Sequence, residues 1–387
     1  MSWLTTDAME QKLAFITQSS KTPKGSFAAL CRKFGISRKT GYKWRGRFEE
    51  KGQVIALEER SRRPHKCRRI DSTLVQRIVA LRQPDGWGAR KIAHLLWEQG
   101  LRVSVATVHR TLLRQKLVHP LDQHSCAPAR FERAAPNDLF QVDFKGAMGR
   151  AAARDEPLSV LDDHSRYAVG LFAMRDHTWE RVRDCFIAVF ERCGKPRQML
   201  MDHGTPWWNG SNGWGLSRLA VFLIEQDIDL IFGRVAHPQT QGKVERFHRT
   251  LARSMIRQGL PQRWDQWQSR YDGFVQRYNQ ERPHEALGMR RPAERYVKSG
   301  RTYRLGAEPW AYPPPLQELR VDAHGSIRWE GRRYFICEAL VHHQVAVEPV
   351  GEQLLVRFRN MYVREIELAT GHTWPFIHPV KEMSPMS

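Results

Sequence analysis

The chain has 387 residues, and its content of 41% hydrophobic and 10% aromatic residues is sufficient for folded cores, which excludes wholesale disorder. Its 62 Lys and Arg exceed its 41 Asp and Glu, and the formal charge of +21 favours a polyanionic partner such as nucleic acid. A purely solubilising surface is the alternative interpretation. No window approaches the length of an apolar membrane span, and we expect neither a membrane segment nor a secretory leader.

The excess positive charge is concentrated in the first third of the chain. Residues 1–130 hold 26 Lys and Arg against 10 Asp and Glu, as expected for a DNA-binding arm ahead of a less basic body. No two of the six cysteines form a Cys-x-x-Cys pair. We therefore predict reduced thiols rather than a disulfide framework or a zinc ribbon.

The first domain, residues 1–59, has the pattern of a helix-turn-helix. An amphipathic stretch over residues 26–34 ends at Gly35, and Ser37 is a natural N-cap for a second stretch that runs to Phe48. In this motif the second helix enters the major groove of DNA. Its basic side chains are therefore predicted to contact DNA: Arg38, Lys39, Lys43, Arg45 and Arg47. An ordinary helical hairpin with a charged face is the alternative.

A basic linker is predicted over residues 60–70. Its composition suits a segment that follows a DNA backbone or a minor groove, although a solvated spacer would have the same composition. The side chains predicted to contact DNA in this linker are Arg62, Arg63, Lys66, Arg68 and Arg69.

A second helical domain is predicted over residues 71–120. Three helical stretches separated by glycines repeat the helix-turn-helix layout, and they cover residues 71–82, 89–99 and 104–116. We interpret them as a second DNA-binding module. A helical bundle that only packs on its neighbours is a serious alternative. A linker over residues 121–135 follows.

The pattern changes to a mixed α/β domain over residues 136–296. Short apolar strands alternate with amphipathic helices in this region. The predicted strands cover residues 139–144, 158–162, 167–173, 198–201 and 228–232, and the predicted helices include residues 178–193 and 243–257.

The end of the chain is predicted to be all-β. After a linker over residues 297–319, residues 320–387 show the alternation of antiparallel strands, with a hairpin turn near Gly331 and another turn at Gly351. We expect a small antiparallel β-barrel. Because it holds no recognisable chemistry, it is expected to dock or to contact DNA rather than to catalyse.

Three carboxylates in the α/β domain are the strongest candidates for chemistry. Asp143 lies at the end of the first predicted strand, Asp202 follows a later apolar strand, and Glu245 lies near the start of a helix. Two strand ends of one sheet and an adjacent helix can bring three carboxylates together. Such hard oxygen donors suit Mg²⁺ or Mn²⁺, and a pair of ions can serve phosphoryl transfer.

Each of these residues also has a purely structural interpretation, as a turn cap, a loop start or a surface charge. The helical pattern around Glu245 weakens that interpretation for the third carboxylate. Val244, Phe247 and Leu251 form one apolar stripe, so Glu245 falls on an adjacent face and can point into a site while the helix is anchored in the core.

Several motifs together resemble the integrase-type core of bacterial insertion-sequence transposases. They are Gln141-Val-Asp-Phe-Lys, Leu161-Asp-Asp-His-Ser-Arg-Tyr, Met201-Asp-His-Gly-Thr, His237-Pro-Gln-Thr-Gln-Gly-Lys-Val-Glu-Arg-Phe-His-Arg-Thr-Leu and Tyr278-Asn-Gln-Glu-Arg-Pro-His-Glu-Ala-Leu, followed by Arg291-Pro-Ala-Glu. The resemblance covers residues 136–296 in detail and the N-terminal helices by layout.

The resemblance implies a ribonuclease-H-like fold and Mg²⁺-dependent DNA cleavage and joining. In the family the three acidic positions form a catalytic and metal-binding triad, which carries over to Asp143, Asp202 and Glu245, with two Mg²⁺ ions and Mn²⁺ as a substitute. It further implies binding of double-stranded terminal repeats and target DNA, a homo-oligomer that pairs two element ends, and a bacterial cytoplasmic, nucleoid-associated location. The interval from Asp202 to Glu245 is longer than usual for the family, and the extra residues are attributed to the loop 207–215.

Further side chains near the predicted site are candidates for DNA contact. They are His237, Gln239, Lys243 and Arg249, with a solvated basic face as the alternative. Trp207, Trp208 and Trp214 are candidates to stack on splayed bases, and packing against the core is the alternative.

Two other functions compete with a transposase. A DNA-binding regulator that lost catalysis would be expected to lack a carboxylate, and none of the three is missing. A metal-dependent nuclease that cuts without joining has the same sequence features, so only a strand-transfer product separates it from a transposase. A membrane-surface protein fits poorly because the charge is not gathered on a strongly amphipathic helix.

Overall fold

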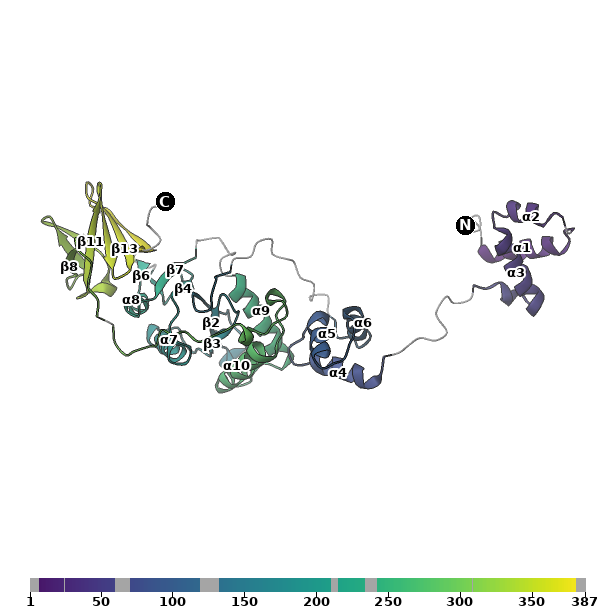
Figure 1. The fold of residues 1–387 in the computed structure, drawn as a ribbon, viewed down its shortest axis with the longest axis horizontal. Helices are drawn as coiled ribbons and strands as arrows, with labels where there is room; N and C mark the ends of the chain where they lie inside the picture. Colours follow the sequence, from purple (N-terminus) through teal and green to yellow (C-terminus); the bar gives the residue numbers. More distant parts are fainter. Residues whose placement is uncertain are drawn as a thin grey trace. The chain divides into compact units, whose positions relative to one another are not determined.

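The chain divides into two compact units, and the boundary between them falls between Ile70 and Asp71 in the sequence. The computed structural model, whose elements are labelled in Figure 1, describes residues 7–23, 25–59, 70–118, 132–209, 215–233, 242–307 and 309–380. Among these residues no helix has both the length and the apolar character needed to cross a membrane.

The first unit is a small helical domain built around aromatic side chains. It contains α1 (Ala8–Ser20), α2 (Phe27–Lys33), α3 (Arg38–Lys51) and a 3₁₀ turn η1 (Val54–Leu57). The core of this unit is formed by Phe15, Ile16, Phe27, Leu30, Cys31, Ile36, Trp44 and Leu57. Because these apolar residues recur at helical spacing on all three helices, each helix buries one face against the other two.

The turn between α2 and α3 forms as predicted. Gly35 takes a positive φ of 65°, which glycine adopts without steric cost, and the Ser37 hydroxyl accepts a hydrogen bond from the Thr40 N–H at 3.2 Å. A Cβ atom at Gly41 would lie 2.7 Å from the Cys31 sulfur. The two helices therefore approach more closely here than a larger residue allows.

The second unit begins with α4 (Ser72–Arg82), α5 (Ala89–Glu98) and α6 (Val105–Arg114). Their bounds agree with the predicted stretches. Ser104 caps α6 by accepting a hydrogen bond from the Thr107 N–H at 3.2 Å. The fully buried side chains among these helices are Ile78, Ile92, Leu96 and Val108.

A five-stranded sheet forms the centre of the second unit, in the order β3-β2-β1-β4-β7. β1 pairs antiparallel with β2 and parallel with β4, and β4 pairs parallel with β7. The strands are β1 (Leu139–Phe144), β2 (Leu158–Asp162), β3 (Ala168–Phe172), β4 (Gln198–Met201) and β7 (Asp229–Phe232). Antiparallel β1–β3 followed by parallel β4 and β7 agrees with the integrase-type core expected from the sequence.

Helices cover both faces of this sheet. Val160 of β2 packs with α7 (Trp179–Cys193) and α8 (Arg218–Glu225), whereas its neighbour Leu161 packs with α9 (Gly242–Arg257) and α10 (Trp267–Gln276). Successive strand residues point to opposite faces, which explains this division. α10 and the π-helical turn η6 (Arg277–Glu281) that extends it were not predicted from the sequence.

The C-terminal strands form an open sheet. A five-stranded antiparallel sheet has the order β14-β13-β12-β11-β8, and β9 and β10 form a separate hairpin. The strands are β8 (Gln317–Arg320), β9 (Ser326–Trp329), β10 (Arg332–Phe335), β11 (Gln344–Val350), β12 (Gln353–Phe358), β13 (Met361–Glu367) and β14 (Thr373–Pro379). The turns predicted near Gly331 and at Gly351 are present.

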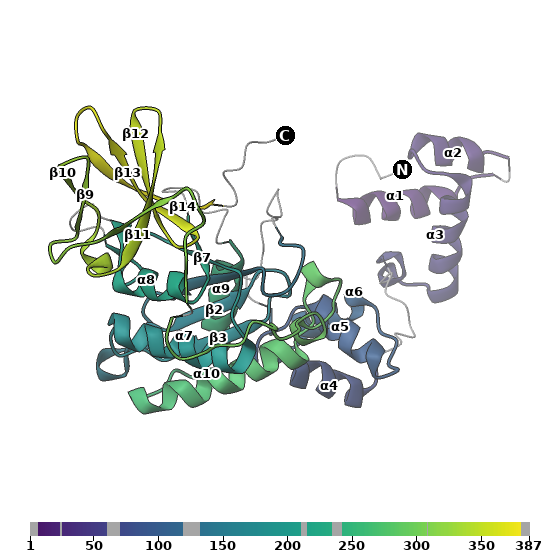
Figure 2. The same ribbon diagram turned by 60° about the vertical axis from the view of Figure 1, so that its left-hand side comes forward.

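The predicted closure into a β-barrel is not confirmed, because no pairing in the described residues joins β14 to β8. Edge strand β14 contains Pro375 and Pro379, which have no N–H to donate to a further strand. It lies instead against β7 and against β6 (Gly215–Leu216), and Figure 2 shows β14 beside β7. The C-terminal sheet is therefore fixed to the central sheet through its edge.

Candidate active site

The first two predicted carboxylates lie side by side. In the parallel pairing of β1 with β4, Gln141 is opposite Leu200, and Asp143 and Asp202 each follow two residues later. Both therefore lie at the carboxyl end of adjacent parallel strands, where α/β proteins place ligand sites. The β1–β4 pairing brings the two strand ends together, and hydrogen bonds from the segment after β4 then orient Asp202.

The third carboxylate comes from the first turn of α9. Val244, Phe247, Leu251 and Met255 of this helix are buried, whereas Glu245 is exposed. The predicted amphipathic stripe is thus present, and α9 packs on β1 and β2. The helix is anchored through its apolar face and leaves Glu245 on the side of the strand ends.

The electrostatics connect the three carboxylates. The Asp143 side chain is only 21% exposed, and burial, followed by the negative charges of Asp202 and Glu245, raises the pKa of Asp143 to about 7. In the described residues, however, no group of three His, Cys, Asp or Glu side chains is arranged as metal ligands. The negative charges of Asp202 and Glu245 thus act on Asp143, but the three carboxylates are not arranged as a set of metal ligands.

Trp207 holds Asp202 in place. Its indole Nε1 donates to Asp202 Oδ1 at 2.7 Å, and the Gly204 N–H donates to the same oxygen at 2.8 Å. The ring is 1% exposed and stacks on Phe144 at 4.9 Å between centroids. Trp207 therefore packs in the core, and its burial leaves no free face for a splayed base; Trp214 lies outside the described residues.

Gly204 is required for this arrangement by close approach. A Cβ atom at this position would lie 2.9 Å from Asp202 Oδ1. The absence of a side chain thus lets the backbone N–H reach the carboxylate. This close contact explains the glycine in the His-Gly-Thr sequence after Asp202, and the sequence pattern alone does not reveal it.

His248 is a site residue that the sequence interpretation did not assign. Its Nδ1 lies 3.7 Å from Asp143 Oδ2, and its Nε2 hydrogen-bonds with Ser159 Oγ at 2.9 Å. Burial lowers the pKa of His248 to about 3, so the ring is neutral at pH 7. The sequence signal that could have identified His248 is its position three residues after Glu245 on α9.

A buried carboxylate fastens the start of α9 to β1. Asp163 accepts hydrogen bonds from Gln141 Nε2 and from the Arg133 N–H, both at 2.8 Å, and pairs with the Lys243 ammonium. Gln141 Oε1 in turn accepts from the Val244 N–H at 3.3 Å. This chain of contacts fixes the helix turn that carries Glu245.

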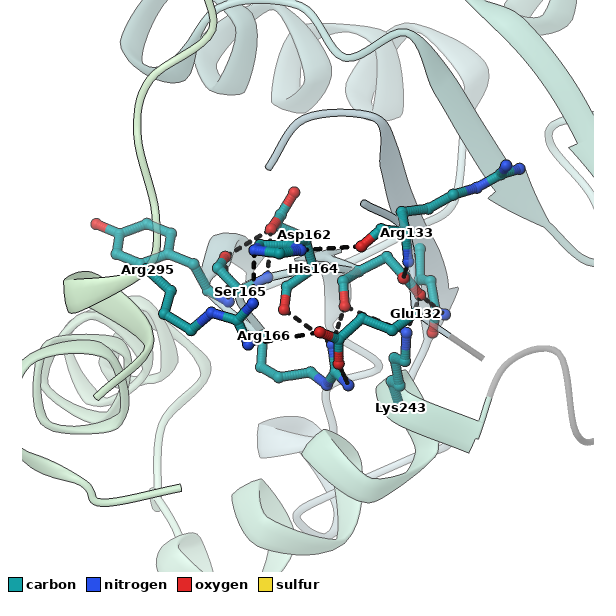
Figure 3. Close-up of polar contacts among 11 residues, drawn as sticks. Glu132, Arg133, Asp162, His164, Ser165, Arg166, Lys243 and Arg295 are labelled. Atoms are coloured by element: carbon teal, nitrogen blue, oxygen red, sulfur yellow. Dashed lines mark hydrogen bonds and ion pairs between the residues drawn. The ribbon is translucent and has the colours of Figure 1, made fainter. Parts of the chain in front are cut away.

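Lys243, predicted as a DNA contact, is placed differently. Its ammonium is turned toward Asp163, and burial lowers its pKa. Figure 3 shows the side chain within this group of polar contacts. In this structure Lys243 positions α9, and its placement does not favour the predicted DNA contact.

The surrounding polar contacts in Figure 3 connect the turn between β2 and β3 to more distant segments. Arg166 Nη2 donates to Glu132 at 2.6 Å, and His164 Nδ1 hydrogen-bonds with the Arg133 carbonyl at 2.9 Å. Arg295 Nη2 lies 2.7 Å from His164 Nε2. The motif Leu161–Tyr167 therefore fixes loops around the core.

The predicted DNA-contact residues of the first unit divide into two groups. Arg38, Lys39 and Lys43 are exposed on α3. Arg45 is partly buried and pairs with Glu49. Arg47 is partly buried too, and its guanidinium lies over the Trp44 ring at 4.9 Å.

Tyr42, which the sequence interpretation did not assign, is 53% exposed between the basic residues of α3 and adds an aromatic contact surface. The other predicted DNA contacts are placed as follows. Arg249 is exposed on α9. Seven further residues lie outside the described residues: Arg62, Arg63, Lys66, Arg68, Arg69, His237 and Gln239.

Comparisons with known families agree with this architecture. Residues 11–65 match a helix-turn-helix domain, residues 40–112 a homeodomain-like domain, and residues 226–292 an integrase core domain. The resemblance to insertion-sequence transposases with an integrase-type core is confirmed. The integrase-core match includes Glu245, whereas Asp143 and Asp202 lie before it. The integrase-core match supports an enzyme of the polynucleotidyl transferase type, and the helix-turn-helix matches support DNA binding.

Solved structures of retroviral integrases are also similar to the chain. Two forms of the HTLV-2 integrase catalytic core domain in complex with magnesium share 14% identity over 42% of this chain and 97% or 99% of theirs, with TM-scores of 0.32 and 0.33. A simian T-cell lymphotropic virus intasome in complex with a PP2A regulatory subunit shares 11% identity over 79% of this chain and 96% of that chain, with a TM-score of 0.39.

Proposed function

We propose that the protein is a DNA transposase that cleaves the ends of a mobile element and joins them to target DNA, with Asp143, Asp202 and Glu245 as the catalytic triad. The observation that carries the proposal is the β1–β4 register, which aligns Asp143 with Asp202 at the same sheet edge. The raised pKa of Asp143 supports it, since burial is the largest cause and the nearby negative charges of Asp202 and Glu245 raise the pKa further.

The donor set fits divalent cations. Three carboxylates that repel one another would be stabilised by positive charge, and hard oxygen ligands suit Mg²⁺, with Mn²⁺ as a substitute. When bound, two such ions would activate the attacking oxygen and stabilise the leaving oxygen of a phosphodiester. The HTLV-2 integrase core domain was solved with magnesium, which is consistent with this choice.

Neighbouring side chains contact or position the three carboxylates. Trp207 and Gly204 hold one oxygen of Asp202, so that its orientation is set before DNA binds. Neutral His248 contacts Asp143 and introduces no competing positive charge. The Asp163 network sets the start of α9 and thereby the position of Glu245.

The proposed chemistry consists of two displacements at phosphorus. In the first, a water oxygen bonds to the phosphorus at the element end and the 3′-oxygen leaves, taking up a proton as a free 3′-hydroxyl. In the second, this hydroxyl oxygen bonds to a target phosphorus, loses its proton, and displaces a target 3′-oxygen. The carboxylates act throughout as ligands.

The DNA partners are assigned to the helical modules. We propose that α3 binds the terminal repeats through Arg38, Lys39, Tyr42 and Lys43, and that α6 contributes a second DNA-facing surface. The basic residues of the predicted linker 60–70, together with His237 and Gln239, remain proposed contacts. Pairing of two ends implies a homo-oligomer, and the simian viral relative was solved as an intasome.

The test uses labelled DNA from both flanks of this gene, a target plasmid and Mg²⁺. Wild type is expected to nick the 3′ ends and to give joined product, whereas Asp143→Asn gives neither. Asp184→Asn, an exposed change of the same chemistry on α7, is the matched control and retains both activities.

Three results contradict parts of the proposal. Nicking without joining by wild type would indicate a nuclease. Tight binding without cutting in Mg²⁺ or Mn²⁺ would indicate a regulator. Cutting that survives Asp143→Asn would remove Asp143 from the triad.

A further inference from the structure

A positively charged pocket lies between the second helical module and α9. Its volume is about 170 Å³, and it is lined by the start of α5, by the solvent-facing side of α9 and by the segment after η6. Six Lys or Arg and two acidic side chains line it, namely Arg82, Lys91, Arg246, Arg249, Arg253 and Arg282 with Asp85 and Glu285. We call it the α5–α9 pocket.

The two acidic side chains of this pocket already have partners. Asp85 pairs with Arg277 at 3.0 Å and accepts a hydrogen bond from the Ser254 hydroxyl. Glu285 pairs with Lys91. Glu285 and Asp85 also attract the Arg282 guanidinium electrostatically. Two carboxylates do not balance six Lys and Arg side chains, however, and the lining keeps an excess of positive charge.

Two buried donors in the pocket lack partners. Arg282 is 9% exposed and Trp87 is 8% exposed, and neither Arg282 Nε nor Trp87 Nε1 has a hydrogen-bond partner in the structure. An unsatisfied buried donor is costly, and more so when it is charged. Arg282 and Trp87 both line the α5–α9 pocket, so an anion bound there would lie beside the Arg282 guanidinium.

The backbone at the start of α5 also favours an anion in the α5–α9 pocket. α5 begins at the pocket after Gly88, whose position offers no capping side chain, and the first turn of α5 has no acidic residue. The free N–H groups of a helix start favour an anion. Burial, followed by the positive charge of Arg282, lowers the pKa of Lys91 to about 8, although Glu285 acts in the opposite direction.

We propose that the α5–α9 pocket binds one phosphate group of the DNA backbone and thereby fixes the DNA held by the second module to the helix that carries Glu245. The proposal rests on the proposed function, since it concerns the DNA that reaches the triad. Arg249 and Arg253 follow Glu245 by four and eight residues, or about 6 and 12 Å along α9. At about 3.4 Å per nucleotide the bound phosphate lies roughly two to four nucleotides from the cleaved bond.

The test is a scan of single neutral phosphates. Duplexes from the flanks of this gene, each with one methylphosphonate, are titrated without divalent ions against wild type, Arg282→Met and the rim variant Arg249→Gln. We expect one position, two to four nucleotides from the cleaved bond, at which the methylphosphonate weakens binding to wild type about tenfold. In both variants that position is expected to lose its effect.

Arg263→Met, which removes an equal charge from an exposed site after α9, is the matched control and should retain the sensitive position. Thermal unfolding of each variant checks the fold, and the exposed Arg249 keeps the test informative if Arg282→Met does not fold. No sensitive position, or one that both variants retain, overturns the proposal.

A second arm uses inorganic phosphate alone. If phosphate stabilises wild type but neither variant, while the duplex scan shows no sensitive position, the pocket serves a free anion and the DNA proposal is wrong. Because both arms measure binding without metal, their failure is separate from failure of the strand-transfer assay.

Discussion

The α1–α3 module and the α4–α6 module share a helix-turn-helix layout, but charged side chains are left exposed in the first and form ion pairs with the core in the second. In the first module, α3 leaves Arg38 and Lys43 exposed. In the second, charged residues attach the module to the core, where Asp85 pairs with Arg277 at 3.0 Å, Lys91 with Glu285, and Glu98 with Arg291 at 2.5 Å. The same local pattern thus forms a separate unit in one case and part of the catalytic unit in the other.

The two modules also differ in how they are connected to the helix that carries Glu245. The first module joins the remainder through residues 60–69, which lie outside the described residues. The second contacts α9 itself, since Ser254 of that helix hydrogen-bonds with Asp85. The second module is therefore attached directly to the helix that carries Glu245, whereas the first is a separate unit, and the following changes test this distinction.

The largest effect is expected from Asp85→Ala. This buried carboxylate serves both Arg277 and Ser254, and breaking a buried pair by removing one partner costs about 3–5 kcal/mol. Calorimetry should show a lower unfolding temperature for the second unit and an unchanged transition for the first. Equal shifts of both transitions would contradict the separation of the units.

In the first module, Gly41→Ala should destabilise by about 1–3 kcal/mol, because its Cβ would overlap the Cys31 sulfur. Gly46→Ala, in the same helix but with open space around it, should instead stabilise by about 0.5–1 kcal/mol. Urea denaturation of the two variants measures both signs. A loss of stability in both would place the cause in the helix backbone rather than in the contact.

Lys91 gives the second module a pH dependence. Burial lowers its folded pKa to about 8 from its ordinary value of 10.5, so between these values the unfolded chain binds more protons. Its contribution therefore raises stability by about 2 kcal/mol from pH 7 to 9.5. Urea denaturation should show this rise in wild type and in Lys43→Met, but not in Lys91→Met. An equal slope in Lys91→Met would assign it to other groups.

A smaller effect than that of Lys91 is expected from the exposed basic residues of α3. Arg38→Ala combined with Lys43→Ala should weaken DNA binding about tenfold and lower the slope of log affinity against log salt by roughly 2, one unit per lost phosphate contact. Fluorescence anisotropy over a salt series measures both. An unchanged slope would mean that these residues do not meet phosphates.

Features that depend on neighbouring residues were predictable from the sequence. The cap at Ser37 is a local hydrogen bond, and short apolar runs located β1, β2 and β4. The apolar stripe of α9 likewise identified the exposed face with Glu245. In each case the deciding interactions span at most a few residues.

Features that depend on distant partners were not predictable. The contact of His248 with Asp143 needs the folded sheet, and the pairing of Asp85 with Arg277 spans 192 residues. The barrel prediction was not confirmed for a similar reason, since alternation defines strands but not which edge a strand meets. Edge strand β14 meets β7 of the central sheet.

The β1–β4 register has a consequence for how this site tolerates change over evolution. The pairing ends at Gln141 opposite Leu200, and Asp143 and Asp202 each follow two residues later, so the length of the chain between the two strands does not affect their alignment. Insertions in the connecting loops can accumulate without moving either carboxylate. One residue inserted within β4 itself would instead turn every later side chain of that strand to the opposite face.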